Sequence, residues 1–373
     1  MDRNSDVVVI GAGLIGLAVA DELARRGRKV SVLDERPPHE AASWAGAGML
    51  APHPERKGSA GFESLCLRSF QQYPRFVADL IERTGIDPQL RTDGVLLVAT
   101  SGEEAERLSA RAHELKASGV EARWLDEMQA RAFEPALGAQ HRGAAFVAAG
   151  GQVDNRDLLG ALETACLRAG VQIDRESANA CLEVEHGRVR AVKTARARFA
   201  APVVVNATGA WAGLLKGVPP GAAIPVSPVK GQMLALRALA PPVRRLMWLN
   251  DCYLVPGRGG RVLVGATIEQ AGFDTRVTAA GVHQLLALAI THLPQLADAE
   301  LIETWAGLRP GSPDGLPFLG VSDIEGYVLS GGHYRNGILL APITALLIAD
   351  LLDGKRMFRA GEFAKAAADG WPG

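Results

Sequence analysis

The sequence predicts a mixed fold: an α/β, Rossmann-like dinucleotide-binding domain joined to an α+β domain that contains an antiparallel sheet. Three observations carry this prediction. A run of β-branched residues at positions 7–10 leads directly into a Gly-x-Gly-x-x-Gly motif at positions 11–16. A second apolar strand pattern, at positions 203–205, ends in the small-residue turn Asn-Ala-Thr-Gly. Several further strand patterns lie between residues 224 and 270 and favour a separate antiparallel sheet.

The glycines of the first motif stand where a bound dinucleotide requires them. Gly11 permits the tight turn after the strand, Gly13 lets a pyrophosphate approach the backbone, and Gly16 lets the next helix pack against the strand. An isolated motif of this kind is a weak signal, but its position between a strand and a helix makes it specific. The alternative is an ordinary strand–turn–helix without a ligand.

The segment after the motif continues the dinucleotide-binding pattern. Residues 17–26 are predicted to form a helix that ends at Gly27, and residues 29–33 a second strand that ends at Asp34. An acidic residue in this place accepts a hydrogen bond from a ribose hydroxyl. We therefore expect Asp34 to bind the adenosine half of the ligand.

Composition and charge exclude several classes of protein. The chain has 373 residues, enough for two or three domains, and 48% of them are apolar. A net charge of −1 provides no basic excess that would favour nucleic acid or an anionic membrane. The four cysteines form no Cys-x-x-Cys motif, and the apolar stretch 7–20 is too short to span a bilayer. We expect a soluble, cytoplasmic protein with reduced thiols, no membrane or nucleic-acid partner and no metal site.

The middle of the chain alternates predicted helices and strands. Helices are expected over residues 61–84, 102–118, 157–169 and 278–292, and strands over 95–99, 146–147, 170–173, 180–184, 188–199 as a hairpin, 233–236, 252–256 and 261–266. Residues 42–52 are small and apolar without either periodicity. Such a backbone suits a position against a flat group such as a cofactor ring, although a plain buried loop is the alternative.

The strand at 203–205 is apolar throughout, which is typical of a strand buried on both faces. We expect it in the same sheet as residues 6–10. A strand that ends in Ala-Thr-Gly beside the first strand resembles flavoproteins with two dinucleotide-binding domains, whereas NAD dehydrogenases do not carry it in this way. A generic core strand with a glycine turn is the alternative.

The C-terminal third contains two glycine-rich segments. Residues 305–317 have too many glycines and prolines for regular structure, so a loop is predicted, with Arg309 among apolar neighbours. Residues 327–330 are predicted to be a strand, followed by a loop and by a helix that reaches about Leu352. Pro342 is expected in the first turn of this helix.

The whole chain resembles the D-amino-acid oxidase-like FAD-dependent oxidoreductases, and within them the glycine oxidases of thiamine biosynthesis. The resemblance runs from about Asp6 to Lys355. Its most specific pieces are 47–50 (AGML), 264–267 (VGAT), 307–311 (GLRPG) and 332–342 (GHYRNGILLAP). The chain departs from the family pattern at Asp34, where Glu is more usual, and at Trp248, Asp251 and Ile268, where a Tyr, a His and a Met are expected.

The resemblance implies oxidative deamination with non-covalent FAD. Family members transfer a hydride from the α-carbon of an amine to flavin N5; water converts the imine to an oxo acid and ammonia, and O2 reoxidises the flavin with release of H2O2. For this chain the implied substrates are glycine, sarcosine and small D-amino acids, with glycine imine supplied to thiamine thiazole synthesis. The family also implies a homotetramer. Residues 312–314 (SPD) stand where covalently linked relatives carry a cysteine.

This chemistry needs a group that holds the substrate carboxylate more than it needs a base. Arg309 can hold a carboxylate with two parallel hydrogen bonds, and Tyr253 can donate to the same group. Arg335 is expected to order the site, and these three form the predicted catalytic set. The predicted substrate pocket consists of Met49, Trp248, Asp251 and Ile268. The predicted FAD-binding residues are Gly11, Gly13, Leu14, Ile15, Gly16, Asp34, Glu35, Ala42, Ser43, Ala47, Gly48, Met49, Cys181, Thr208, Gly209, His333, Tyr334, Arg335, Asn336, Gly337, Ile338 and Leu339.

The predicted FAD-binding domain is discontinuous and covers residues 1–85, 145–215 and 300–373, with a substrate domain over 86–144 and 216–299. Two other functions stay open: a dehydrogenase of the same fold that passes electrons to a membrane quinone, and an FAD-binding module without turnover. The first would need an exposed membrane-facing segment, which the sequence does not show. Arg309 and Tyr253 together argue against the second.

Overall fold

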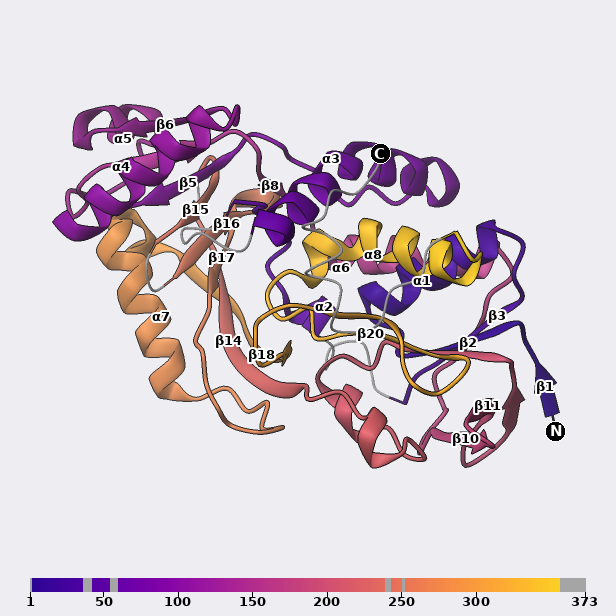
Figure 1. The fold of residues 1–373 in the computed structure, drawn as a ribbon. Helices are drawn as coiled ribbons and strands as arrows, with labels where there is room; N and C mark the ends of the chain where they lie inside the picture. The colour runs from indigo at the N-terminus through magenta and orange to yellow at the C-terminus, as the bar shows by residue number, and fades with distance from the viewer. Residues whose placement is uncertain (1, 36–41, 54–59, 239–242, 250–251, 356–373) are drawn as a thin grey trace.

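The computed structural model describes residues 2–35, 42–53, 60–238, 243–249 and 252–355. They form two main sheets, each with its own helices, which lie side by side (Figure 1). The six-stranded sheet lies at the right of the view, with α1 and α8 above it. The eight-stranded sheet lies at the left, with α4 and α5 above and α7 beside it.

The six-stranded sheet contains the predicted dinucleotide-binding strands. Its order is β19-β20-β13-β2-β3-β9, and every neighbouring pair is parallel except β19 with β20. The strands are β2 (Val7–Ile10), β3 (Val30–Leu33), β9 (Gln172–Asp174), β13 (Val203–Asn206), β19 (Phe318–Val321) and β20 (Tyr327–Gly331). The expected return of the 203–205 strand beside the first strand is confirmed, since Val203 pairs with Val7.

Four helices cover this sheet and share one core. They are α1 (Leu14–Arg25), α3 (Ala60–Thr84), α6 (Asn155–Arg168) and α8 (Gly337–Leu352). Helix α8 is apolar around nearly its whole circumference, which is typical of a buried helix. It packs against α1 and α3, and α1 also packs against α6. The predicted first-turn position of Pro342 was wrong: α8 begins at Gly337, so the proline lies in the second turn.

The eight-stranded sheet has the order β18-β14-β17-β16-β15-β5-β7-β6. Its strands are β5 (Val95–Val98), β6 (Ala122–Leu125), β7 (Ala144–Val147), β14 (Ser227–Arg237), β15 (Leu246–Trp248), β16 (Tyr253–Pro256), β17 (Arg261–Gly265) and β18 (Glu300–Gly311). Its helices are α4 (Gly102–Ala117), α5 (Glu127–Phe133) and α7 (Ala279–His292). All neighbouring pairs are antiparallel except β5 with β15.

The prediction of a loop over residues 305–317 was wrong for residues 305–311, which belong to β18. This strand pairs with β14 from Ser227 opposite Gly311 to Arg237 opposite Glu300. Because β18 is the edge strand, its proline does not interrupt a ladder on the outer side. Residues 145–147 and 300–311, which the sequence assigned to the predicted FAD-binding domain, lie in the eight-stranded sheet and not in the six-stranded one.

Smaller elements complete the described chain. A four-stranded sheet contains β1 (Asp2–Asn4), β10 (Cys181–Glu185), β11 (Arg188–Lys193) and β12 (Arg198–Ala200). Helix α2 (Ala42–Ala45) precedes β4 (Met49–Leu50), which pairs with β8 (Gly151–Gln152). The short 3-10 helices of the described residues are η2 (Gly209–Leu214) after β13, η3 (Pro220–Ala222), η4 (Arg258–Gly260) and η5 (Pro294–Asp298).

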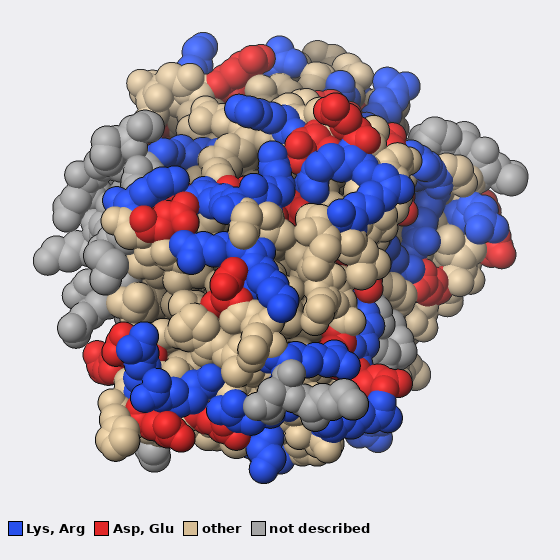
Figure 2. Space-filling view, turned by 90° about the vertical axis from the view of Figure 1, so that its right-hand side faces the viewer, with Lys and Arg blue, Asp and Glu red and all other residues tan. Residues whose placement is uncertain are grey.

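The surface beside β1, β10 and β11 carries charges of both signs. Figure 2 shows basic side chains spread over the face at the right of Figure 1, with acidic ones between them. Several are paired, as in Arg3 with Asp174 at 3.2 Å. Exposed pairs of this kind contribute little to stability. Among the described residues, every helix is too short or too polar to span a lipid bilayer.

Candidate active site

A cavity of about 540 Å³ lies between the two sheets and brings together residues from both. One end is lined by the glycine motif, Asp34 and Glu35, at the carboxyl ends of β2 and β3. The other end is lined by Tyr253 of β16, Arg309 of β18 and the loop that precedes α8. Ligands of open α/β sheets bind at this edge of the strands.

The glycine motif has the geometry that its sequence predicts. Gly11 has a φ of +108°, and a Cβ atom there would lie 2.3 Å from the carbonyl oxygen of Ala207. A Cβ atom on Gly16 would lie 1.9 Å from the carbonyl oxygen of Gly11, so this glycine serves helix–strand packing. The Asp34 carboxylate accepts a hydrogen bond from the Ala12 amide at 2.7 Å. Asp34 is therefore held in place on the cavity wall.

Two helices point uncapped N-termini at the cavity. The N-cap residues of α1 and α8, Gly13 and Asn336, make no capping side-chain hydrogen bond, and neither first turn contains an acidic residue. Both N-cap residues line the cavity. By contrast, side chains cap the other α-helices whose caps are described, namely Ser101 for α4, Asp126 for α5, Asp154 for α6 and Thr278 for α7. Uncapped helix N-termini favour an anionic ligand such as a pyrophosphate or a reduced flavin.

Arg309 is half-buried at the other end of the cavity. Its Nη1 donates to the carbonyl oxygens of Thr267 at 3.2 Å and Lys230 at 3.4 Å. A Cβ atom on Gly231 would lie 2.4 Å from both Nη1 and Nη2, so glycine is required beneath the guanidinium. Within the described ranges, no carboxylate pairs with Arg309, which leaves its second nitrogen able to bind an anion.

Aromatic side chains surround the space near Arg309. The Tyr253 hydroxyl lies 3.6 Å from the Met233 sulfur, and its ring meets Trp248 edge to face with centroids 6.3 Å apart. The exposed guanidinium of Arg335 lies 5.9 Å from the Trp248 ring centroid. Tyr253, Trp248, Arg335 and Met49 all line the cavity.

His333 is buried and is not suited to act as a base. It is 3% exposed, and its Nε2 lies 3.1 Å from the hydroxyl of Thr344 in α8. Burial lowers the pKa of His333 to about 3. The ring is therefore neutral at physiological pH and anchors the loop to α8.

The aperiodic segment 42–52 forms α2 and β4 and follows the cavity wall. The Asn155 side chain donates to the carbonyls of Ser43 at 2.7 Å and Trp44 at 2.9 Å. Trp305 Nε1 donates to the carbonyl of Ala45 at 2.9 Å. The Ser43 hydroxyl in turn accepts from the Leu14 amide at 2.9 Å, so the segment is tied to the start of α1.

Most of the predicted site residues line this cavity, but several do not. Those on the wall are Gly11, Gly13, Ile15, Asp34, Glu35, Ala42, Ser43, Ala47, Met49, Thr208, Gly209, Trp248, Tyr253, Arg309, His333, Tyr334, Arg335, Asn336, Gly337 and Ile338. Leu14, Gly16, Gly48 and Leu339 pack behind the wall instead. Asp251 lies outside the described residues.

Two predicted residues need correction. Cys181 is not on the cavity wall; Asn179 and Ala180 take that place, because β10 begins at Cys181 and pairs its backbone with β11. Ile268 is 57% exposed and lies off the wall. A shift of one residue along a strand changes the face on which a side chain lies, and the sequence does not determine that register.

Sequence reasoning missed several wall residues. They are Glu63, Cys66, Arg175, Ser177, Asn179, Lys216 and Ser330, among others. The hydroxyls of Ser177 and Ser330 are buried and have no hydrogen-bond partner among the described residues. Buried polar groups are normally satisfied, so these two hydroxyls fit a cavity that takes a polar ligand. No motif marks these residues, because they reach the cavity from separate elements.

Comparison with known proteins agrees with this geometry. Residues 6–351 match the family described as DAO, FAD dependent oxidoreductase. The chain belongs to this family. It is 38% identical over 367 residues to the glycine oxidase of Geobacillus kaustophilus, covering 95% of this chain and 94% of that protein. The crystal structure of glycine oxidase from Geobacillus kaustophilus has a TM-score of 0.92 and 37% identity, covering 97% of this chain and 98% of that one.

A further relative is longer than this chain. The bifunctional protein ThiO/ThiG of Synechocystis is 40% identical over 358 residues, which cover 94% of this chain and 52% of that protein. The chain thus spans about half the length of that relative. Family membership makes FAD the cofactor, and the glycine motif, the two uncapped helix N-termini and the unpartnered serines fit it.

Proposed function

We propose that this protein oxidises glycine and small amines such as sarcosine and small D-amino acids to the imine, with O2 as electron acceptor and H2O2 as product. The family and the glycine oxidase relatives support an FAD-dependent amine oxidase. Water converts the released imine to an oxo acid and ammonia. The single observation that carries the substrate class is Arg309, a half-buried guanidinium on the cavity wall with no carboxylate partner among the described residues.

Each side chain near Arg309 has a role in this proposal. When bound, FAD supplies the acceptor for the hydride that leaves the substrate α-carbon. Arg309 binds the substrate carboxylate, and the Tyr253 hydroxyl donates to the same group. The apolar wall formed by Trp248 and Met49 limits the space for a substrate side chain and excludes water. Binding then fixes the α-carbon in one orientation, which is the main requirement of such a transfer.

We further propose that FAD is held without a covalent bond. Of the four cysteines only Cys66 lines the cavity, and burial raises the pKa of its thiol to about 12. A thiol with a raised pKa is a poor nucleophile. Acid precipitation of the purified protein should therefore leave the yellow colour in the supernatant; colour in the pellet would contradict the proposal.

A substrate panel with a peroxide readout tests the activity. Glycine, sarcosine, D-alanine and L-alanine are supplied under air to the purified FAD-loaded protein. Peroxide formation with the small amines, and little with L-alanine, is the expected result. Turnover with an artificial acceptor but without peroxide would favour a dehydrogenase, and no flavin reduction by any amine would favour a non-catalytic module.

The fate of the product is part of the same proposal. In the ThiO/ThiG relative, the region that matches this chain is one part of a longer bifunctional protein. We propose that the glycine imine formed here serves thiamine thiazole synthesis. A strain that lacks this gene should then require thiamine or its thiazole for growth, and unimpaired growth without either would contradict this role.

A further inference from the structure

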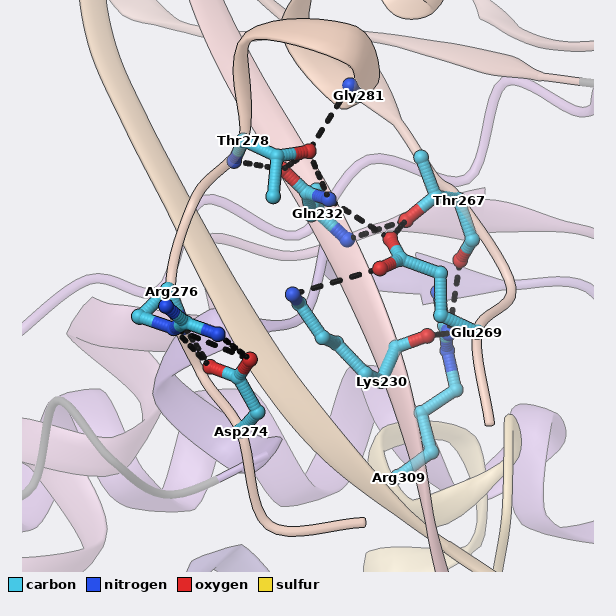
Figure 3. A network of polar contacts seen from close by, with 9 residues as sticks. All are labelled: Lys230, Gln232, Thr267, Glu269, Asp274, Arg276, Thr278, Gly281 and Arg309. Carbon is cyan, nitrogen blue, oxygen red and sulfur yellow. Dashed lines mark hydrogen bonds and ion pairs between the residues drawn. The ribbon is translucent and has the colours of Figure 1, made fainter. Parts of the chain in front are cut away.

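A polar cluster lies directly behind Arg309, away from the cavity wall (Figure 3). Lys230 and Gln232 come from β14, and each is only 1% exposed. Thr267 and Glu269 come from the segment after β17, and Thr278 is the N-cap residue of α7. These residues do not line the cavity, so the proposed reaction assigns them no role.

The Glu269 carboxylate is the centre of the cluster. It accepts hydrogen bonds from Gln232 Nε2 at 2.8 Å and from the Thr267 hydroxyl, and it pairs with Lys230 Nζ at 3.3 Å. Burial acts to raise the pKa of Glu269, but these three donors outweigh it and hold the pKa below its ordinary value. The carboxylate is therefore charged at neutral pH.

The backbone around Glu269 is joined to β14 by hydrogen bonds in both directions. The Glu269 amide donates to the Lys230 carbonyl at 3.0 Å, and the Lys230 amide donates to the Glu269 carbonyl at 3.0 Å. The Thr267 hydroxyl accepts from the Gln232 amide at 2.8 Å. The side-chain cluster and the backbone pairs thus place the carbonyls of Lys230 and Thr267 side by side.

These two carbonyls are the ones that hold Arg309. Its Nη1 donates to both of them, and Figure 3 shows the guanidinium next to the Thr267 and Lys230 backbone. Nη1 is thereby occupied by the protein, while Arg309 also lines the cavity. The orientation of Arg309 depends on where the two carbonyls lie.

The cluster is also joined to α7. Gln232 Oε1 accepts from the Thr278 amide at 2.7 Å, and the Thr278 hydroxyl accepts from the Gly281 amide at 3.1 Å. A Cβ atom on Gly281 would lie 2.5 Å from Gln232 Oε1. The Gln232 side chain is therefore held by Thr278 at its oxygen and donates to Glu269 from its nitrogen. In this way α7 helps to hold the Glu269 carboxylate in place.

We propose that the ion pair of Glu269 with the buried Lys230 positions Arg309 for binding of the substrate carboxylate. This inference rests on the proposed function, in which Arg309 holds that carboxylate. Only Lys230 is buried in this pair, whereas the Glu269 side chain is 31% exposed. The cost of removing the Lys230 charge from water offsets much of the attraction, so stability alone does not account for the pair. A polar cluster joined by several hydrogen bonds favours a single arrangement of the backbone around it. Small displacements of a binding group weaken affinity strongly.

The test uses Glu269→Gln in the FAD-loaded protein, which keeps the side-chain size and removes the charge. We expect KM for glycine to rise about tenfold, as for other residues that orient a ligand-binding group, with kcat changed less than about threefold. The Kd of acetate, measured from the flavin absorbance, should rise by a similar factor because acetate presents a carboxylate without an amine. FAD content should be unchanged.

The matched control is Glu300→Gln. It removes the exposed ion pair of Glu300 with Arg237, 3.2 Å apart, which joins β18, the strand of Arg309, to β14, the strand of Lys230. This variant should leave KM and the acetate Kd at the wild-type values. An equal loss in both variants would show a general effect of sheet stability and would overturn the inference.

A double-mutant cycle separates this inference from the proposed function. With Arg309→Ala already present, Glu269→Gln should change the acetate Kd by less than about twofold, because the residue that it positions is gone. If the two substitutions raise the acetate Kd by factors that multiply independently, the positioning role is overturned and the proposed function is not. An unchanged glycine KM in Arg309→Ala would overturn the proposed function itself. If Glu269→Gln does not fold, Thr267→Val removes one donor to the carboxylate without a charge change, and the same cycle applies.

Discussion

The hydroxyl of Tyr73, on α3, donates a hydrogen bond to the carbonyl oxygen of Ile338 in the first turn of α8. Within α8 that carbonyl would normally accept from the amide four residues later, but that residue is Pro342, which has no N–H. Tyr73 is completely buried. It thus satisfies an acceptor at the start of the helix whose N-terminus faces the cavity.

Tyr73→Phe should lower the free energy of unfolding by about 1–3 kcal/mol, since it leaves a buried carbonyl without a donor. Urea denaturation of the FAD-free protein measures this. In the Pro342→Ala background the helix provides its own amide donor, so the same substitution should cost clearly less. Equal losses in the two backgrounds would mean that the hydroxyl serves another role.

Asp34→Ala should weaken FAD binding about tenfold to a hundredfold, because hydrogen bonds to a charged acceptor contribute about 1.5–3 kcal/mol. The loss includes the 2.7 Å bond from the Ala12 amide that holds the turn. Flavin fluorescence during titration of the apoprotein gives the dissociation constant. Glu35→Gln is the control, since Glu35 accepts from the Asn179 amide at 2.9 Å. A larger rise of the FAD dissociation constant in Glu35→Gln than in Asp34→Ala would indicate that Glu35 makes the ribose contact.

Arg309→Ala should reduce kcat/KM for glycine about thirtyfold to a thousandfold. This factor corresponds to a loss of about 2–4 kcal/mol in binding free energy. Arg309→Lys keeps the charge but loses the two-pronged geometry, so it should also be impaired. An alkylamine without a carboxylate should be a poor substrate that the substitution hardly affects. If glycine and alkylamine turnover fell equally, or if FAD were lost, Arg309 would be structural and Arg335 the next candidate.

Stability should fall as the pH drops below about 6.5, partly because of His333. The unfolded chain binds a proton there below about pH 6.5, whereas burial keeps the folded group neutral down to about pH 3. Between pH 6.5 and 5.0 this difference amounts to about 2 kcal/mol. Burial also lowers the pKa of His53 and His141, so these histidines add to the same pH dependence. The free energy of unfolding is therefore measured against pH in the wild type and in His333→Gln, and the variant should lose less stability as the pH falls. Identical pH profiles would exclude this contribution.

Local patterns in the sequence predicted the dinucleotide-binding half well. The glycine turn at 11–16, the acidic end of the second strand and the neighbouring position of the strand at 203–206 all depend on residues close together in the chain or on strands buried on both faces. The helix at 60–84 was equally predictable, since its apolar residues repeat at helical spacing. Such signals need no knowledge of distant partners.

Only the tertiary structure decided how the end of the cavity near Arg309 is built. Residues 305–311 contain glycine and proline and have little strand propensity, yet they form β18 because β14 offers a complete ladder along them. A glycine there also has a packing reason, since a Cβ atom on Gly307 would lie 2.3 Å from the Ala45 Cβ. Propensity describes the isolated segment, and pairing over eleven positions outweighs it.

The sequence by itself predicted a dinucleotide-binding site at the glycine turn and an arginine in an apolar setting that we expect to bind an anion. It could not determine that Lys230, Gln232 and Glu269 gather behind that arginine, because the first two lie almost forty residues from the third and meet it only across an antiparallel pair. Strand register decides which side chains share a face, and long-range pairing decides register. The positions of the side chains around the cavity follow from this packing, whereas their chemical types can be recognised from the chain alone.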